Sequence, residues 1–477
     1  MISAMLALEA CSASRSDRKS VITELMRSYH DLGQFNGAWL VADASGIVAE
    51  GGLGEANREW DIPNTVETKF NLGSITKQFT AALVLTLVDD GLVDLDSTIS
   101  TYLPEYRHDV GSTVTIHHLL THTGGFFLPP MSHKEYDAFF REKHTSDEIV
   151  RALTGTEPQF APGTRFSYSS AGYIVLGAIV ERMTGLAYGE VLRVRLFDPL
   201  GMVNTGIDDN ESIIPRRAAG YQTNYGWGNA RYKYYPNSFS SGAVYSTVKD
   251  LYKWDRAIRD GRILSAASRR KLFQRHVGSH RGSYGYGWFV DDRPIGDSLV
   301  PVAFHAGDNS GFSAIIVRSL AADQFVALLT NTEGTHYYEI AFNLLAVLNG
   351  ADPVEPKAYV ADILRHSVYT ESQGAVRARY AALTAEGLEA HNTDEEELLE
   401  LGYDLLYAER PEDAVMVLEI TTEIHPSSFD ALTSLAEGYE VAGRTVDAIA
   451  TYERALTLKP GDEVVMAALS ELRQRLQ

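Results

Sequence analysis

Ser74 and Lys77 stand three residues apart, and together they could form a nucleophile and its base. The stretch 70–82 has an extended apolar approach and a glycine, followed by about sixteen residues of helical periodicity that end at Gly91. This pattern predicts Ser74 at a helix N-terminus with Lys77 on the same face. The unpaired N–H groups of the first turn and the helix dipole favour a serine alkoxide and disfavour a charged lysine. With desolvation, the pKa of the lysine would fall from about 10.4 towards neutrality, so its free amine could take the serine proton.

The Ser-x-x-Lys spacing is weak evidence by itself, because it recurs in this chain. Three further copies occur, at Ser16/Lys19, Ser246/Lys249 and Ser268/Lys271. The first lies in a polar N-terminal segment, the second fits a capping box, and the third lies in an Arg-rich exposed run. Only Ser74 combines a strand-like approach, a glycine and a strongly apolar helix. The alternative, that Ser74 only caps a helix, stays open at this point.

Length and composition limit the classes of protein to be considered. At 477 residues the chain is long enough for two or three domains, and its 45% hydrophobic and 22% charged content is that of a globular protein. A formal charge of -21 argues against nucleic acid and anionic membranes as partners. No apolar run approaches the ~20 residues that span a bilayer. The single cysteine, Cys11, excludes a disulfide framework and a Cys-rich zinc site.

Residues 1–17 form an N-terminal tail or the remnant of an export signal. The first eleven residues are largely apolar and end at Cys11, where a lipid-modified protein would begin. However, the segment has no basic start, and Glu9 interrupts its apolar core. A truncated start and an unstructured cytoplasmic N-terminus explain it equally well.

Strand and helix patterns at both ends of residues 18–350 predict one α+β domain. The predicted strands are residues 37–42, 46–51, 300–305, 312–317 and 325–330, and the flanking helices are residues 17–32 and 338–348. The connections between the three late strands are too short for parallel crossovers, so the sheet is predicted to be antiparallel. A largely helical insertion carries Ser74, and residues 220–235 are predicted to be loop.

Residues 351–360 are predicted to be a linker, and residues 361–477 an acidic, all-helical domain. Its sequence repeats with a displacement of about 34 residues. The matching positions are Leu401/Leu435, Ala408/Ala442, Arg410/Arg444, Asp413/Asp447, Ala414/Ala448 and Pro426/Pro460. This pattern resembles tetratricopeptide repeats, with helices 376–385 and 463–476 as caps, and it implies a module for protein binding or self-association. The alternative is an unrelated pair of helical hairpins.

Two further segments carry groups that a serine nucleophile would need. Tyr168 precedes an apolar helix over residues 174–183, where its phenol could serve as phenolate base and then protonate a leaving group. His305 and Gly307 are predicted at the end of an edge strand, where backbone N–H groups and the imidazole could orient a substrate carbonyl. The structural alternatives are a tyrosine that anchors its helix and a buried strand histidine. Tyr235 is a rival for the tyrosine, although no helix is expected after it.

Taken together, these segments resemble the serine β-lactamase and penicillin-binding superfamily, in its class C β-lactamase-like branch with family VIII carboxylesterases. The resemblance covers about residues 20–350 and rests on segments 73–81, 119–125, 168–170, 245–251, 284–288 and 305–307. It implies Ser74 as the acylated nucleophile, Lys77 as its activating amine and Tyr168 as the catalytic phenol. It also implies an oxyanion hole formed by the backbone N–H groups of Ser74 and Asp308.

Two departures from the family pattern bear on the substrate. Ser170 stands where the family usually has Asn, and His305-Ala306-Gly307 replaces Lys-Thr-Gly, whose lysine helps to bind a substrate carboxylate. We therefore expect hydrolysis of small esters or amides ahead of efficient β-lactam turnover. D-amino peptide hydrolysis, or D-alanyl carboxypeptidase activity, is one alternative. A catalytically idle scaffold that binds a protein partner through its repeats is the other.

Neither a metal nor a cofactor is expected. His118 and His122 are four residues apart, with His117 beside them, but no His-Glu-x-x-His pattern accompanies them. The resemblance implies an extracytoplasmic bacterial protein, periplasmic or lipid-anchored. The incomplete signal leaves a cytoplasmic location open.

Overall fold

A computed structural model describes residues 15–125, 133–154, 157–223, 227–296 and 298–475 of the chain. It contains two compact units, of which the first reaches Glu355 and the second begins at Pro356. The apolar segment that ends at Cys11 lies outside the described residues. Within the described ranges, no helix has the length and apolar character that a membrane crossing requires.

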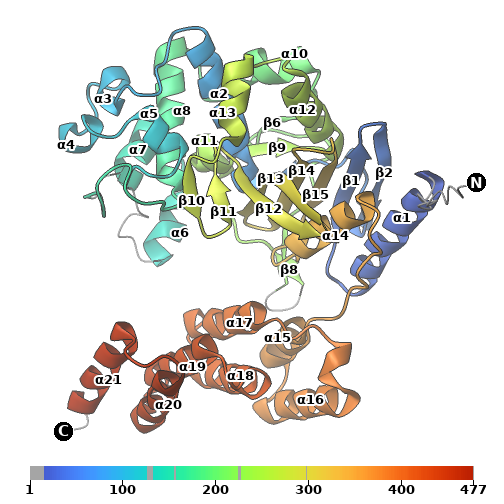
Figure 1. Cartoon of the computed structure of the whole chain (residues 1–477), viewed down its shortest axis with the longest axis vertical. Helices are drawn as coiled ribbons and strands as arrows, with labels where there is room; N and C mark the ends of the chain where they lie inside the picture. The colour runs from blue at the N-terminus through green and yellow to red at the C-terminus, as the bar shows by residue number, and fades with distance from the viewer. Residues whose placement is uncertain (1–14, 126–132, 155–156, 224–226, 297, 476–477) are drawn as a thin grey trace, which may run out of the picture. The chain divides into compact units, whose positions relative to one another are not determined.

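The first unit is built on an eight-stranded antiparallel sheet with the order β10-β11-β12-β13-β14-β15-β1-β2 (Figure 1). Its strands are β1 (Gly37–Asp43), β2 (Gly46–Leu53), β10 (Val277–Ser279), β11 (Gly282–Tyr284), β12 (Phe289–Ile295), β13 (Ser298–Asn309), β14 (Phe312–Ser319) and β15 (Phe325–Thr330). β1 pairs with β15, with Gly37 opposite Thr330, so strands from both ends of the unit are neighbours. The predicted α+β class and antiparallel sheet are confirmed. Strands β10–β12 were not predicted, because two are short and β12 contains the charged run Asp291-Asp292-Arg293 followed by Pro294.

Alternate residues of the sheet pack into two hydrophobic cores on its two faces. On one face, residues such as Leu40 and Leu329 pack with α2 (Thr76–Asp89), α8 (Ser170–Thr184) and α12 (Val248–Asp260). On the other face, Trp39 and Leu328 pack with α1 (Arg15–Asp31) and α14 (Tyr337–Leu348). This is the period of two that a sheet buried on both faces requires.

Short elements connect the sheet to the larger helices. The short helices are α3 (Ile99–Tyr102), α4 (His108–Gly111), α5 (Ile116–Leu120), α6 (His133–Arg141), α7 (Ser146–Thr154), α9 (Tyr188–Leu192), α10 (Asp198–Leu200), α11 (Phe239–Gly242) and α13 (Ala266–Phe273), with 3-10 turns η1 (Gly73–Ile75) and η3 (Tyr235–Ser238) and the π-helical turn η2 (Arg193–Phe197). The small sheets pair β3 (Glu55–Asn57) with β4 (Ile62–Pro63), β9 (Val244–Ser246) with β5 (Phe70–Asn71) and β6 (Gly206–Ile207), and β7 (Tyr221–Gln222) with β8 (Gly228–Asn229).

Two sequence predictions for this region were wrong. The segment 220–235 contains β7 and β8, and a helix does follow Tyr235, because η3 leads directly into α11. Strands of two residues have no hydrophobic period of their own. Tyr221, for example, is held by a backbone hydrogen bond to the distant Asn331.

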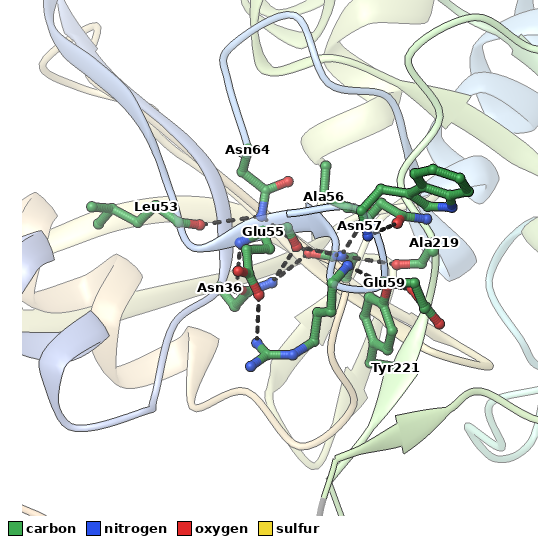
Figure 2. Close-up of polar contacts among 12 residues, drawn as sticks. Asn36, Leu53, Glu55, Ala56, Asn57, Glu59, Asn64, Ala219 and Tyr221 are labelled. Atoms are coloured by element: carbon green, nitrogen blue, oxygen red, sulfur yellow. Dashed lines mark hydrogen bonds and ion pairs between the residues drawn. The ribbon is translucent and has the colours of Figure 1, made fainter. Parts of the chain in front are cut away.

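Asn331 links four segments beneath one end of the sheet. It is fully buried, and its amide donates to the carbonyl oxygens of Glu55 at 3.0 Å and Ala219 at 2.8 Å. The amides of Asn36 and Asn64 donate to its oxygen at 2.6 and 3.2 Å. Figure 2 shows these groups converging around the backbone of Glu55. These hydrogen bonds in a buried setting hold the four segments together.

The second unit is all helical. Its elements are α15 (Val360–Thr370), α16 (Gln373–Glu386), η4 (Leu388–Ala390), α17 (Glu395–Tyr407), α18 (Pro411–Ile424), α19 (Phe429–Val441), α20 (Thr445–Leu458) and α21 (Glu463–Arg475). The pairs α17–α18 and α19–α20 begin at positions that differ by 34 residues. Leu418 of α18 is fully buried at the point where Gly402 and Gly438 leave room for its methyl groups. Helix α15 was not predicted and begins at the last residue of the predicted linker.

Candidate active site

Ser74 lies in the 3-10 turn η1, and Lys77 is the second residue of α2. Lys77 Nζ lies 3.0 Å from Ser74 Oγ, which realises the contact expected from their spacing. The same amine contacts Ser170 Oγ at 3.3 Å and donates to the carbonyl oxygen of Ser241 at 2.9 Å. Three segments far apart in the sequence, η1–α2, α8 and α11, therefore meet at one nitrogen atom.

Lys77 is fully buried, with an exposed fraction of 0%. Burial, with a smaller contribution from the nearby charge of Lys233, lowers the pKa of Lys77 from 10.5 to about 7. A desolvated ammonium loses hydration that three hydrogen-bond contacts replace only in part. At neutral pH a large fraction of this side chain is a free amine, which can accept the serine proton.

Tyr168 also lies beside Lys77, with the centroid of its ring 4.9 Å from Lys77 Nζ. Tyr168 is 36% exposed; partial desolvation by its neighbours raises its pKa, and a hydrogen bond with Ser74 lowers it by less. The phenol is therefore protonated at neutral pH before a reaction begins, and its role as a phenolate base stays a prediction. This geometry suits a proton donor to a leaving group beside an amine that can accept a proton.

His122 positions Tyr168, a role that the sequence did not indicate. Its ring lies 4.4 Å from that of Tyr168, and its Nδ1 accepts the backbone N–H of Ser169 at 3.1 Å. Burial lowers the pKa of His122, so the imidazole is neutral and Nδ1 acts as acceptor. The left-handed backbone of His122, with φ of 57°, directs the ring toward Tyr168 and Tyr173.

The last residues of β13 run against the turn that carries Ser74. A Cβ on Gly307 would lie 2.0 Å from the Leu72 oxygen and 2.6 Å from the Ser74 nitrogen. A Cβ on Gly73 would lie 2.7 Å from the Asp308 nitrogen. Only glycine fits at either position, because the two backbones are in direct contact. The contact places the backbone nitrogens of Ser74 and Asp308 at the same end of the pocket.

Strand β13 differs from its prediction in two ways. It lies between β12 and β14 and is therefore an interior strand. Its pairing with β12 ends at Phe304, so within the described residues no strand pairs with the segment after Phe304 on the β12 side. It also continues through His305 to Asn309. His305 is 2% exposed, with Nε2 at 3.1 Å from the Tyr284 hydroxyl and Nδ1 at 2.6 Å from the Ala306 oxygen. Burial lowers the pKa of His305 to about 3, so its imidazole is neutral. The imidazole ring packs near the ring of Tyr168.

A pocket of about 140 Å³ opens beside Ser74, whose side chain is partly exposed. Its described lining consists of Ser74, Phe140, Leu153, Ser169, Ser170, Ala171, Ile174, Lys233, Ser238, Ser241, Gly242, Asp308 and Asn309. Of the predicted residues, Ser74, Ser170 and Asp308 line it, whereas Tyr168, His305 and Gly307 lie around it. The pocket joins a nucleophile to apolar walls and a cation, a combination that can hold an acyl group.

The serine and histidine residues to which the sequence analysis gave no catalytic or metal-binding role make structural contacts. Ser246 contacts the hydroxyl of Thr205 at 2.7 Å, and Ser268 donates to Asp89. His117 contacts the Tyr286 hydroxyl at 2.7 Å, and His118 forms a capping box with Thr115. Within the described ranges, no group of three or more His, Cys, Asp or Glu side chains is arranged to hold a metal ion.

The amino-acid sequence is similar to those of known penicillin-binding proteins. Penicillin-binding protein 4* of Bacillus subtilis (strain 168) is 26% identical over 416 residues, which cover 81% of this chain and 88% of that protein. Penicillin-binding protein 4 of Amycolatopsis lactamdurans is 29% identical over 354 residues, covering 67% and 90%.

Solved structures give the same result for the fold. The octameric penicillin-binding protein homologue from Pyrococcus abyssi aligns with a TM-score of 0.62 and 26% identity, covering 72% of this chain and 81% of that one. A D-amino acid amidase from Ochrobactrum anthropi SV3 shares the fold, with a TM-score of 0.61, 24% identity and coverage of 70% and 99%. Residues 20–348 match the family model described as Beta-lactamase, and the chain therefore belongs to the β-lactamase family of serine hydrolases and penicillin-binding proteins.

Proposed function

We propose that this protein hydrolyses small esters or amides through an acyl-enzyme on Ser74. The observation that carries the proposal is the 3.0 Å contact between Ser74 Oγ and an amine whose pKa is about 7. Helix capping, the alternative left open by the sequence, does not account for this arrangement. Capping requires neither a fully buried lysine nor a phenol beside it.

Acylation would begin when Lys77 Nζ takes the proton of Ser74 Oγ as that oxygen bonds to the substrate carbonyl carbon. The carbonyl π electrons move to the oxygen, and the N–H groups of Ser74 and Asp308 stabilise the resulting charge. Collapse of this intermediate breaks the bond to the alcohol or amine. The leaving group takes the phenolic proton of Tyr168, which is restored from the Lys77 ammonium, so protons and electrons balance.

Deacylation would repeat these steps with water as the nucleophile. Water transfers a proton to the same amine–phenol pair and attacks the acyl carbon, and Ser74 leaves with a proton returned from Lys77. Ser170 contacts the amine at 3.3 Å, and a hydroxyl here can pass a proton where the family usually has an amide. The replacement of Asn by Ser170 is thus compatible with turnover.

The pocket and the neutral His305 support the proposed substrate class. Because His305 is buried and uncharged, the strand offers no cation in the place of the family's Lys-Thr-Gly lysine. This supports ester or small amide hydrolysis ahead of efficient β-lactam turnover. The relatives named as penicillin-binding proteins support slow acylation by penicillin, and D-alanyl peptides are the second candidate substrate.

A covalent probe tests the nucleophile. Wild type and Ser74→Ala are incubated with a fluorophosphonate or a penicillin, and the adduct is located by mass spectrometry. We expect one adduct, on Ser74, that the variant lacks; a label on another residue would contradict the assignment. A panel of 4-nitrophenyl esters, nitrocefin and D-alanyl peptides then ranks the substrates. Turnover that Lys77→Ala abolishes would exclude an idle binding scaffold.

We also propose that residues 18–350 form the hydrolase domain and residues 361–477 a tetratricopeptide-like module for protein binding or self-association. The repeated spacing of its helix pairs supports this. So does the repeated ion pair at each second helix, in which Arg410 contacts Asp413 at 2.7 Å and Arg444 contacts Asp447 at 2.8 Å. Sedimentation of the full chain over a range of concentrations tests self-association.

A further inference from the structure

Lys233 brings a positive charge into the pocket beside the nucleophile. Of the described residues that line this pocket, it is the only one with a basic side chain. Its Nζ lies 2.8 Å from Asn309 Oδ1 and 4.8 Å from the centre of the Phe140 ring. The ammonium group therefore stands between the end of β13 and an apolar wall, within electrostatic range of Lys77.

The backbone that carries Lys233 is held in place on both sides. Upstream, the hydroxyl of Ser310 donates to the carbonyl oxygen of Arg231 at 2.6 Å, and the N–H of Ala230 donates to the carbonyl oxygen of Gly220 at 3.0 Å. Downstream, Asn210 donates to the carbonyl oxygen of Lys233 at 2.9 Å and accepts the N–H of Tyr235 at 2.9 Å. A cation fixed in this way is preorganised to receive an anion, which reduces the entropy lost on binding.

The position of Tyr168 indicates which part of a substrate would meet Lys233. The phenol that would protonate the leaving group lies against His122 and Phe289 and does not line the pocket. The leaving group must depart on the side of Tyr168, so the pocket on the side of Lys233 receives the acyl group. The apolar walls formed by Phe140 and Leu153 suit its methylene groups.

The carboxylate of Asp308, the acidic residue in the described lining, lies on the other face of the sheet. Asp308 and Asn309 are adjacent residues of β13, so their side chains lie on opposite faces of the sheet. The carboxylate of Asp308 accepts a hydrogen bond from Tyr337 of α14 at 2.8 Å, on the face opposite to α2. The amide of Asn309 lies on the active-site face, where it donates to Asn71 at 3.0 Å.

We propose that Lys233 binds a carboxylate at the far end of the substrate's acyl group, so that the substrates are monoesters or monoamides of short dicarboxylic acids. The proposal rests on the acyl-enzyme function described above and names its substrate class. A charge-assisted hydrogen bond in a partly desolvated pocket is strong enough to set such a preference. The same charge disfavours an acyl group that ends in an ammonium.

Two matched substrates test the proposal: mono-4-nitrophenyl glutarate and 4-nitrophenyl valerate, which differ by a carboxylate in place of a methyl group. The ratio of their kcat/KM values is measured, after subtraction of the rate with Ser74→Ala. We expect wild type to favour the glutarate and Lys233→Met or Lys233→Gln to lower the ratio about tenfold, with Lys233→Arg retaining most of it. Any effect of Lys233 on the protonation of Lys77 acts on both substrates and cancels in the ratio. Lys143→Met, which removes an exposed lysine paired with Glu211, is the control and should leave the ratio unchanged.

Measurements of binding affinity distinguish a failure of the carboxylate-site proposal from a failure of the proposed hydrolase function. Glutaranilic acid and valeranilide carry the same two acyl groups, and their affinities are measured by calorimetry on Ser74→Ala with and without Lys233→Met. Tighter binding of the acid that is lost in the double variant supports the carboxylate site, even if neither ester is turned over. Equal affinities, or a substrate ratio that Lys233→Met leaves unchanged, would overturn it. Absence of Ser74-dependent turnover alone would overturn only the hydrolase assignment.

Discussion

The pH dependence of acylation follows from the burial of Lys77. Its amine must be uncharged to accept the proton of Ser74, and burial with the nearby Lys233 lowers its pKa to about 7. The active fraction therefore increases as the pH rises through this value. His305 does not titrate in this range, because burial lowers its pKa to about 3. Tyr168 keeps its proton over most of this range, because partial desolvation raises its pKa above the ordinary value of 10.0.

The magnitude can be worked out from this pKa. With a pKa of about 7, the neutral fraction of Lys77 is about 0.1 at pH 6 and about 0.9 at pH 8, so kcat/KM should rise about tenfold between them. A lysine with the ordinary pKa of about 10.4 would be neutral in roughly one molecule in 2,500 at pH 7. The buried site thus increases the amount of active base at neutral pH by about a thousandfold.

The assay is the kcat/KM of a 4-nitrophenyl ester between pH 5.5 and 9, corrected with Ser74→Ala at each pH. We expect a single ascending limb with its midpoint near pH 7 and no descending limb up to pH 9. Lys233→Met removes a like charge and should move the midpoint to higher pH, whereas Lys143→Met should not. A midpoint near pH 10, or a flat profile that still depends on Ser74, would refute the assignment of Lys77 as the base.

Three further substitutions give expected outcomes. Lys77→Met should abolish activity and raise the free energy of unfolding at pH 7 by on the order of 2 kcal/mol. The reason is that the unfolded lysine gains its proton below about pH 10.4, whereas the folded lysine gains it only below about pH 7. Urea unfolding should therefore show that the gain in stability disappears toward pH 10. Gly307→Ala should lower both activity and thermal stability, because its Cβ would meet two backbone atoms, whereas Gly278→Ala, with open space around it, should change neither. Leu418→Ala should cost about 2–5 kcal/mol in chemical denaturation of the helical unit, because it empties a fully buried site; a cost under about 1 kcal/mol would contradict the packing described.

The amino-acid sequence was sufficient to predict the elements whose hydrophobic pattern is local. Strands β1, β13, β14 and β15 and the helix after Ser74 follow from periodicities within a few turns of chain. The pairs α17–α18 and α19–α20 follow from a sequence repeat of 34 residues. The short range of the Ser74–Lys77 contact likewise follows from a spacing of three residues. Where hydrophobic periods are interrupted, as in β12 and in segment 220–235, the prediction failed.

The groups that meet the nucleophile from distant parts of the chain are known from the folded structure alone. Lys77 loses its hydration because α8 and α11 close over it, and its contacts with Ser170 and Ser241 join positions that are 93 and 164 residues away. The burial of His305, the placement of Tyr168 against His122 and the entry of Lys233 into the pocket are long-range results of the same kind. Local periodicity records whether a residue faces a core, whereas the identity of its neighbours depends on how the sheet and helices pack, and this packing sets the pKa of Lys77.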